Sequence, residues 1–404
     1  MIKRVSLLSL SLLLLLTGCF GKDELEKEEK VVQEKGKKDE KAIITGEINT
    51  GEKYYRSIFP FEPGGARGVI RFGVDNRLDI NEFEMGLMRV AQETFSTDKY
   101  FFQEGQFLNE STVTNWLKRA DEKSNKSKSD FNQKGLNPAL GVKINENDPK
   151  YTDNLLEANK KNPKYLSYVL EHNYLVQSGD GKVKLGGVVV GLSFNSTYYY
   201  DAKDKAGLIY PGQVKLDRNK VKAEAKKMAG EVASRLRSNP KLQDVPIVIA
   251  LYQEEERDSV TPGNFFGAGV VKKGSNSVSS WEDVNEDYVL FPSSAASKNK
   301  RDDYEKFNSF KAKVQQYFPN FIGVIGRGFY KDGNLERMSV EIPVQFRGKA
   351  ELISFTQFVA TSALDELPNV PIEVYINSAV DQPEALIVKD ETTQDEPFVH
   401  IYRK

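Results

Sequence analysis

The chain has 404 residues, with 57 basic and 58 acidic side chains and a formal net charge of −1. Nucleic acids bind proteins through a basic face, so this balance argues against nucleic acid as a partner. Charged residues make up 28% of the chain and hydrophobic residues 39%, which is typical of a globular protein. The length allows two domains. The single cysteine, Cys19, cannot form an intrachain disulfide, so stability must come from burial of apolar side chains.

The N-terminus predicts a secretory signal. Lys3 and Arg4 precede an apolar run over residues 5–16, and small residues follow that run. This order of charged, apolar and small residues is typical of an export signal. The run is shorter than the ~20 residues that a membrane-spanning helix needs. We therefore expect residues 1–18 to direct export and then to be removed.

Leu16, Thr17, Gly18 and Cys19 form the pattern of a bacterial lipobox. The small Thr17 and Gly18 allow the backbone to enter a narrow peptidase site, and the Cys19 thiol receives a diacylglyceryl group. Each buried CH₂ of the acyl chains contributes ~0.8 kcal/mol, and two chains anchor a protein stably. The sequence therefore predicts recognition by signal peptidase at residues 16–18. It also predicts a diacylglyceryl-Cys19 anchor at the outer face of the cell membrane. The alternative is an ordinary signal with a chance cysteine.

A segment rich in Lys and Glu follows, with few hydrophobic residues. Such a segment buries too little apolar surface to offset the entropy cost of ordering the chain. We expect residues 19–43 to comprise the lipidated cysteine and a charged tether, which separates the folded body from the bilayer.

Ordered structure is expected to begin near residue 44. Aromatic and β-branched side chains over residues 54–61 predict a strand. Apolar residues at helical spacing predict a helix over 79–95, with Asp79 or Asn81 as its N-cap. The other elements expected in this half are a helix over 111–119, a surface loop over 120–134, strands over 165–177 and 183–200, a helix from Asp217 to about residue 238, and strands over 245–252 and 267–271.

The order strand, turn, strand, helix, strand then recurs. Its members are strands over 321–330 and 335–346, a helix over 349–367 and a strand over 370–376. When the two hairpin turns are aligned, Val188 falls on Val340, and alternate positions match, as expected for one buried face. The sequence therefore predicts two related repeats, residues 44–273 with an insertion and residues 274–404. The alternative is that two unrelated segments have similar patterns.

Turn residues recur at intervals that suit hairpins rather than parallel crossovers. We therefore predict an α+β fold with a β-β-α-β core in each repeat. Each repeat would be a mainly antiparallel sheet with helices packed on one face. A parallel sheet is the alternative.

Motifs for catalysis and metal binding are absent from the sequence. The two histidines, His172 and His400, belong to no zinc motif, and neither a phosphate-binding loop nor a G-x-S-x-G motif occurs. We therefore predict no catalytic, cofactor-binding or metal site. Carboxylates over residues 254–258 are interpreted as an exposed acidic loop. A glycosidase-like pair that includes one of them is the alternative.

One stretch, residues 59–68 (FPFEPGGARG), combines two aromatic residues, two prolines and a glycine pair. These residue types can shape a rigid loop that presents a side chain for binding. Such a run more often forms a turn whose phenylalanines pack inward. The other interpretation is a binding loop with Phe59, Phe61 and Arg67 as its contact residues.

The lipobox, the charged tether, the stretch YYRSIFPFEPGGARG and the closing strands VPIVIALYQ and VPIEVYINS resemble the CamS family. These are Gram-positive lipoproteins described as sex-pheromone precursors. The resemblance covers nearly the whole mature chain and implies two related repeats and an extracytoplasmic lipoprotein. In some members the tail of the cleaved signal peptide is trimmed to a short apolar pheromone, which here would be residues 11–18. The resemblance implies no activity for the mature body.

We therefore expect a non-enzymatic, lipid-anchored surface protein. Its body would bind an unidentified ligand outside the membrane, and its signal peptide would yield a peptide that another cell reads. A second hypothesis is an extracytoplasmic hydrolase that acts on cell-wall or peptide substrates through carboxylates. A third is a purely structural surface spacer.

Overall fold

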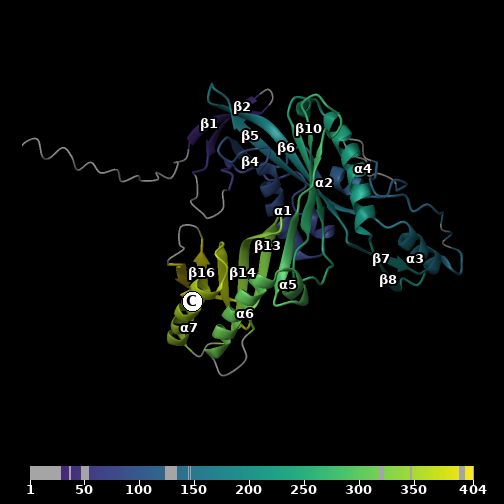
Figure 1. Cartoon of the computed structure of the whole chain (residues 1–404). Coiled ribbons are helices and arrows are strands. Elements are labelled where there is room, and N and C mark those ends of the chain that lie inside the picture. The colour runs from purple at the N-terminus through teal and green to yellow at the C-terminus, as the bar shows by residue number, and fades with distance from the viewer. Residues whose placement is uncertain are drawn as a thin grey trace, which may run out of the picture.

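The computed structural model describes residues 29–35, 38–46, 54–122, 134–143, 145, 147–317, 323–345, 348–390 and 396–403. Within these ranges the chain forms a nine-stranded sheet, a six-stranded sheet and a two-stranded sheet, with helices packed on the two larger sheets (Figure 1). The lipobox, residues 16–19, and most of the loop expected over 120–134 lie outside the described residues.

The first large sheet and its helices occupy the N-terminal two thirds of the chain. Its strands are β1 (Glu29–Lys35), β2 (Lys38–Ile44), β3 (Ile58–Phe59), β4 (Tyr100–Glu104), β5 (Leu166–Gln177), β6 (Lys182–Phe194), β9 (Ile247–Gln253), β10 (Asn264–Val271) and β11 (Trp281–Glu282). The helices of this part are η1 (Val69–Phe72), α1 (Arg77–Gln92), α2 (Glu110–Trp116), α3 (Tyr151–Lys161), α4 (Arg218–Arg237) and η2 (Pro240–Leu242). The two-stranded sheet consists of β7 (Thr197–Lys203) and β8 (Ile209–Lys215).

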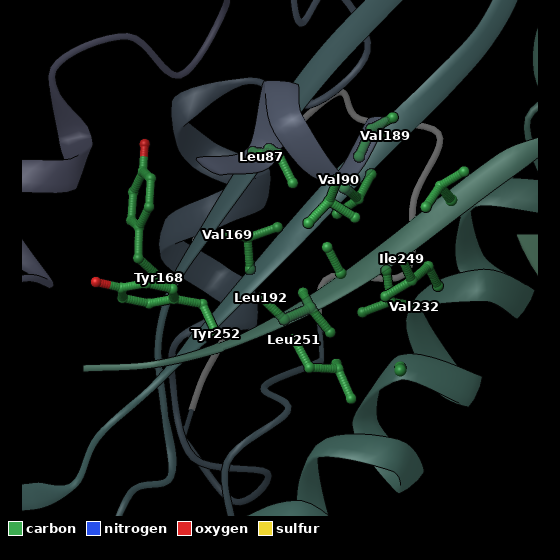
Figure 2. Packing of buried hydrophobic residues seen from close by; sticks show 14 of the residues in the cluster. Leu87, Val90, Tyr168, Val169, Val189, Leu192, Val232, Ile249, Leu251 and Tyr252 are labelled. Atoms are coloured by element: carbon green, nitrogen blue, oxygen red, sulfur yellow. The ribbon is translucent and has the colours of Figure 1, made fainter. Parts of the chain in front are cut away.

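Helices cover both faces of the first sheet. A side chain at Gly191 of β6 would lie 2.8 Å from Phe83, so this face of β6 packs on α1. Figure 2 shows Leu87 and Val90 of α1 on one side of the strands and Val232 of α4 on the other. The prediction of helices on one face does not hold for this sheet. The reason is that β6 is apolar at consecutive positions, a pattern typical of strands buried on both faces.

An aromatic cluster fixes α1 on its face of the sheet. The ring of Phe83 lies 5.2 Å from that of Tyr252 on β9 and 5.9 Å from that of Phe265 on β10. All three side chains are fully buried. Each such burial contributes about 1.5–3 kcal/mol, so α1 is held firmly against β9 and β10.

The second large sheet follows along the chain. Its strands are β12 (Glu286–Phe291), β13 (Ile325–Lys331), β14 (Asn334–Val344), β15 (Ile372–Ser378), β16 (Pro383–Lys389) and β17 (Phe398–Ile401), in that order across the sheet. Its helices are α5 (Ser294–Asn299), α6 (Arg301–Gln316) and α7 (Lys349–Glu366). Phe307 of α6 and Phe355 of α7 share one core with Val340 of β14. The predicted α+β class and the mainly antiparallel pairing are confirmed.

The two large sheets share a pattern of strand pairing. In each, an antiparallel hairpin (β5–β6, β13–β14) leads through a helix to a parallel strand, and an antiparallel strand follows. The Val188 N–H donates to the Pro246 carbonyl at 3.2 Å, and the Met338 N–H donates to the Pro371 carbonyl at 3.0 Å. Val188 therefore has the position of Met338 and not of Val340, because β6 runs two residues further than β14 before its parallel pairing begins. A shift of two residues keeps the same face buried. The duplication itself remains a prediction.

The second half of the expected tether is part of the first sheet. β1 and β2 form an antiparallel hairpin, and Val32 of β1 pairs with Lys182 of β6. Val31, Ala42 and Ile44 are buried in a small core of their own. The tether prediction is therefore wrong for residues 29–35 and 38–43, because their few apolar side chains alternate onto one face of the two strands and give them a core.

Three further details differ from the sequence expectations. β11 still pairs with β10, so the chain passes between the sheets at residues 283–285 rather than at residue 273. The N-cap of α1 is Asn76, whose side chain accepts from the Leu78 N–H at 2.8 Å. Helix α3 and the β7–β8 hairpin were not predicted as such. Asp217 caps α4 as expected, since its side chain accepts from the Lys220 N–H at 2.9 Å.

Among the described residues, no helix combines the length and the apolar character that crossing a membrane requires.

Candidate functional site

The candidate binding loop, residues 59–68, presents its aromatic side chains to solvent. Phe59 is 57% exposed and Phe61 is 47% exposed, so the expectation of inward packing is wrong. The guanidinium of Arg67 lies 5.4 Å from the centre of the Phe61 ring, within the range of a cation–π contact. The structure therefore brings Phe61 and Arg67 together on one exposed surface.

Backbone hydrogen bonds hold this loop against the loop that follows β4. The Gly64 N–H donates to the Glu104 carboxylate at 2.5 Å, and the Gly65 N–H donates to the Gly105 carbonyl at 3.1 Å. The N–H of Glu110, the first residue of α2, also donates to the Gly65 carbonyl at 3.0 Å. A Cβ at Gly64 or Gly65 would lie 3.2 Å from a backbone oxygen of the neighbouring loop, a tighter contact than side chains normally make. Close approach of the two backbones therefore explains the glycine pair.

Carboxylates surround Arg67. Its Nε lies 3.5 Å from Oε1 of Glu104. Burial raises the pKa of Glu84, the nearby Glu104 raises it further, and Arg67 lowers it. The loop thus offers an aromatic surface and one guanidinium beside acidic groups. This arrangement suits contact with a ligand or partner rather than proton transfer.

Glu171 of β5 is the residue that fixes the neighbouring loop. Its carboxylate accepts hydrogen bonds from three consecutive N–H groups, those of Gln106 (3.1 Å), Phe107 (3.0 Å) and Leu108 (2.6 Å). Burial raises the pKa of Glu171 to about 7, although these backbone donors act in the opposite direction. Glu171 is therefore a positioning residue for the binding loop. Sequence reasoning missed it, although a glutamate within an apolar strand was a visible signal.

The acidic run over 254–258 divides into two parts. Residues 255–258 are exposed as expected, but Glu254 is buried. Its carboxyl group accepts hydrogen bonds from the hydroxyls of Ser167 and Ser193. Burial raises the pKa of Glu254 to about 8, and the two serine hydroxyls lower it. The prediction of exposure is wrong for Glu254 because this residue directly follows β9 and turns onto β5 and β6.

Asp79 has a similar structural role. It accepts hydrogen bonds from the Tyr252 hydroxyl and the Gly263 N–H, both at 2.6 Å, and from the Glu255 N–H at 3.2 Å. Burial raises its pKa to about 6. Asp79 is therefore not the N-cap of α1, because its carboxylate fixes the loop between β9 and β10 instead.

The two histidines have different surroundings. His172 directly follows Glu171 on β5 and pairs with Glu104 of β4, so it lies beside the residues that hold the two loops. His172 is buried, its ring meets that of Phe102 edge-on at 5.0 Å, and burial lowers its pKa to about 3. His400 lies on the exposed strand β17. His172 is therefore a core residue, in keeping with its interpretation from sequence.

A cavity of about 120 Å³ lies where the two large sheets meet. Residues of α1, β10, the connection over 280–286 and the turn between β13 and β14 line it, and Figure 1 shows α1 next to β13. The buried acids Asp79, Glu171 and Glu254 are not among its lining residues. No feature of the sequence indicated this cavity, because its walls come from distant segments.

The comparisons with known proteins agree with the resemblance noted in the sequence. The chain matches the family model described as "CamS sex pheromone cAM373 precursor" over residues 61–395. A crystal structure of a sex pheromone precursor from Lactobacillus salivarius subsp. salivarius UCC118 is 30% identical, with a TM-score of 0.72, over 89% of this chain and 99% of that chain. The C-terminal domain of the sex pheromone staph-cAM373 precursor from Staphylococcus aureus is 32% identical, with a TM-score of 0.66, over 83% and 100% of the two chains.

No curated protein sequence matches the chain. The similar structures are sex pheromone precursors, and the mixed α+β fold of this chain is similar to theirs. The chain belongs to the CamS sex pheromone cAM373 precursor family.

Proposed function

We propose that the mature chain is a lipid-anchored, extracytoplasmic, non-enzymatic binding protein, and that its cleaved signal peptide is the source of a short apolar pheromone peptide. The observation that carries this proposal is the lipobox at Leu16–Cys19, in a chain that belongs to a family of sex pheromone precursors. Two acyl chains on Cys19 would hold the protein at the membrane surface. The peptide would be residues 11–18.

The environments of the buried acids support binding rather than hydrolysis. Asp79, Glu171 and Glu254 each accept hydrogen bonds from backbone N–H or hydroxyl groups of the protein itself. A hydrolytic pair would instead direct two carboxyl groups into a cleft, on either side of the bond to be cleaved. Asp79 lies near enough to Glu254 to raise its pKa, but both carboxyl groups are held by the protein's own donors and neither lines the cavity.

The binding role is assigned to the loop over residues 59–68. Its exposed Phe59, Phe61 and Arg67 offer apolar area and a guanidinium, two features enriched at contact surfaces. The hydrogen bonds of Gly64 and Gly65 fix the backbone beforehand, which lowers the entropy cost of binding. A purely structural spacer would have no need of such a fixed aromatic surface.

Processing of Cys19 variants tests the proposal. Cys19→Ala should leave an unlipidated precursor that still carries residues 1–18, because the acceptor thiol is lost. Gly18→Ala is the matched control, since it keeps a small residue before the cysteine and should be processed normally. Membrane fractionation and N-terminal mass analysis report both outcomes. Maturation and lipid-dependent membrane partitioning of Cys19→Ala would refute the anchor.

A further inference from the structure

The joint cavity, as we call the space between the two large sheets, has an apolar floor. Val90 of α1, Val248 of β9 and Val270 of β10 are among its lining residues. Its volume is about 120 Å³. An apolar cavity of ~150 Å³ accommodates a benzene-sized group, so the joint cavity fits a group of only a few carbon atoms.

The rim of the joint cavity is acidic. Five carboxylates and two cations line it: Glu93, Glu282, Asp283, Glu286 and Asp332, with Arg89 and Lys331. The C-terminal end of α1 also lies here, with Glu93 as its C-cap. The carbonyl groups at a helix C-terminus add partial negative charge. The lining therefore favours a positively charged ligand.

Both cations of the lining already have carboxylate partners. Arg89 lies 2.8 Å from Glu286 and 2.6 Å from Glu82. Lys331 lies 3.2 Å from Glu93. The protein thus neutralises two of the carboxylates that line the cavity.

Three carboxylates of the rim remain. Glu282, Asp283 and Asp332 are exposed, and within the described ranges they form no ion pair. They come from both parts of the chain, since Asp332 lies in the turn between β13 and β14. A cation placed over the apolar floor would therefore meet carboxylates of the first and the second sheet at once.

We propose that the joint cavity binds a primary ammonium group on a short apolar stem, as presented by the N-terminal residue of a peptide or by a lysine side chain. The apolar stem fills the floor, and the ammonium group contacts the carboxylates of Glu282, Asp283 and Asp332. Primary ammonium suits this rim because it carries three donors and a compact charge. The inference goes beyond the proposed function and holds whether or not Cys19 is lipidated.

Calorimetric titration of the full folded body with three peptides tests this inference. The probes are Leu-Gly-Gly with a free N-terminus, its N-acetylated form, and a lysine tripeptide blocked at both ends. We expect saturable binding of at least one amine-bearing probe and at least tenfold weaker binding of the N-acetylated peptide. Binding of only one amine probe identifies the source of the ammonium group. No binding of either amine probe, or equal binding of the acetylated form, overturns the inference.

Variants locate the binding in the joint cavity. The double change Glu282→Gln and Asp283→Asn should weaken binding at least tenfold, and Ala268→Phe should abolish it by filling the cavity. Glu157→Gln, on the distant α3, is the matched control for loss of one exposed acid and should bind like the wild type. Wild-type affinity in both cavity variants would overturn the inference. The comparison of free and acetylated peptides on the wild-type protein stands even if a variant fails to fold.

Discussion

Nε of Arg89 in α1 lies 2.8 Å from Oε1 of Glu286 in β12, so this ion pair connects α1 of the first part of the chain to the second large sheet. Glu82 lies 2.6 Å from the same guanidinium, which also lies 4.4 Å from the centre of the Phe329 ring on β13. Tyr288 of β12 donates to Glu82 at 2.5 Å. The two parts of the chain therefore meet through a buried network of charged and aromatic groups rather than through a flexible linker.

This network predicts a large loss of stability on replacement of Arg89. Arg89→Met leaves Glu286 buried without its cation and leaves Glu82 with only Arg337, at 3.9 Å. Loss of one partner of a buried pair costs about 3–5 kcal/mol. Urea unfolding measures the effect. Arg301→Met is the control, because the Arg301–Glu305 pair is solvent-exposed and should contribute less than about 1 kcal/mol. Equal losses for the two variants would contradict a structural role for the network.

The raised pKa of Glu254 predicts that the free energy of unfolding falls as pH rises. That pKa is about 8 in the folded protein, against an ordinary value of 4.5, so the folded state retains a proton that the unfolded state has lost. Between pH 4.5 and 8 this group should lower the free energy of unfolding by up to ~1.4 kcal/mol per pH unit. Above pH 8 both states are deprotonated and its effect becomes constant.

Glu254→Gln is the variant that isolates this effect. Glutamine retains an oxygen that accepts from Ser167 and Ser193 but has no proton to lose. Urea unfolding at several pH values should show a shallower decline for the variant between pH 5 and 8. Identical pH profiles for the two proteins would show that Glu254 does not carry the dependence.

The close packing of Gly105 on Glu171 predicts that a side chain at position 105 is costly. A Cβ at this position would lie 2.5 Å from Cβ of Glu171 and 2.6 Å from its carbonyl oxygen. Gly105→Ala should therefore cost about 1–3 kcal/mol by overpacking. It should also raise hydrogen exchange of the Gly64 and Gly65 amides.

Gly230 on α4 provides the matched control for the Gly105 substitution. A Cβ at Gly230 would meet no atom within 4 Å, so Gly230→Ala should stabilise the helix by up to about 1 kcal/mol. Thermal unfolding compares the two substitutions directly. A neutral Gly105→Ala would contradict the tight contact with Glu171.

Ile44 distinguishes a hairpin from a tether. It is fully buried in β2, so Ile44→Ala should cost about 2–5 kcal/mol in local or global stability. Lys41→Ala, on the exposed face of the same strand, should change stability by less than about 0.5 kcal/mol. If Ile44→Ala has no effect on unfolding or on hydrogen exchange in β1 and β2, the segment behaves as a tether.

Periodic apolar spacing was sufficient to predict the main elements. Val221, Ala225 and Val232 recur at helical spacing, and the structure has α4 there, with all three side chains buried. The hairpin β1–β2 was missed because Lys and Glu surround its few apolar residues. Its strand structure also depends on pairing with β6, which lies far along the chain. The β7–β8 hairpin was missed because most of β8 is exposed and gives no apolar alternation.

The candidate site was predictable in part. The composition of residues 59–68 was compatible with a binding loop but favoured a turn with inward-packed phenylalanines, whereas Phe59 and Phe61 are exposed. Glu171 could not be assigned its role from sequence, since its N–H donors lie 63 to 65 residues earlier in the chain. The joint cavity could not be predicted from the sequence either, because its walls meet only after both sheets have formed.

Mass analysis of the native protein, extracted from membranes, together with peptides from the culture medium, tests the central proposal most directly. We expect an N-terminal peptide that begins at Cys19 and carries a diacylglyceryl group, and a released peptide that ends at Gly18. A mature protein with an unmodified Cys19 thiol, or one that retains residues 1–18, would contradict the proposed lipid anchor and the proposed origin of the peptide.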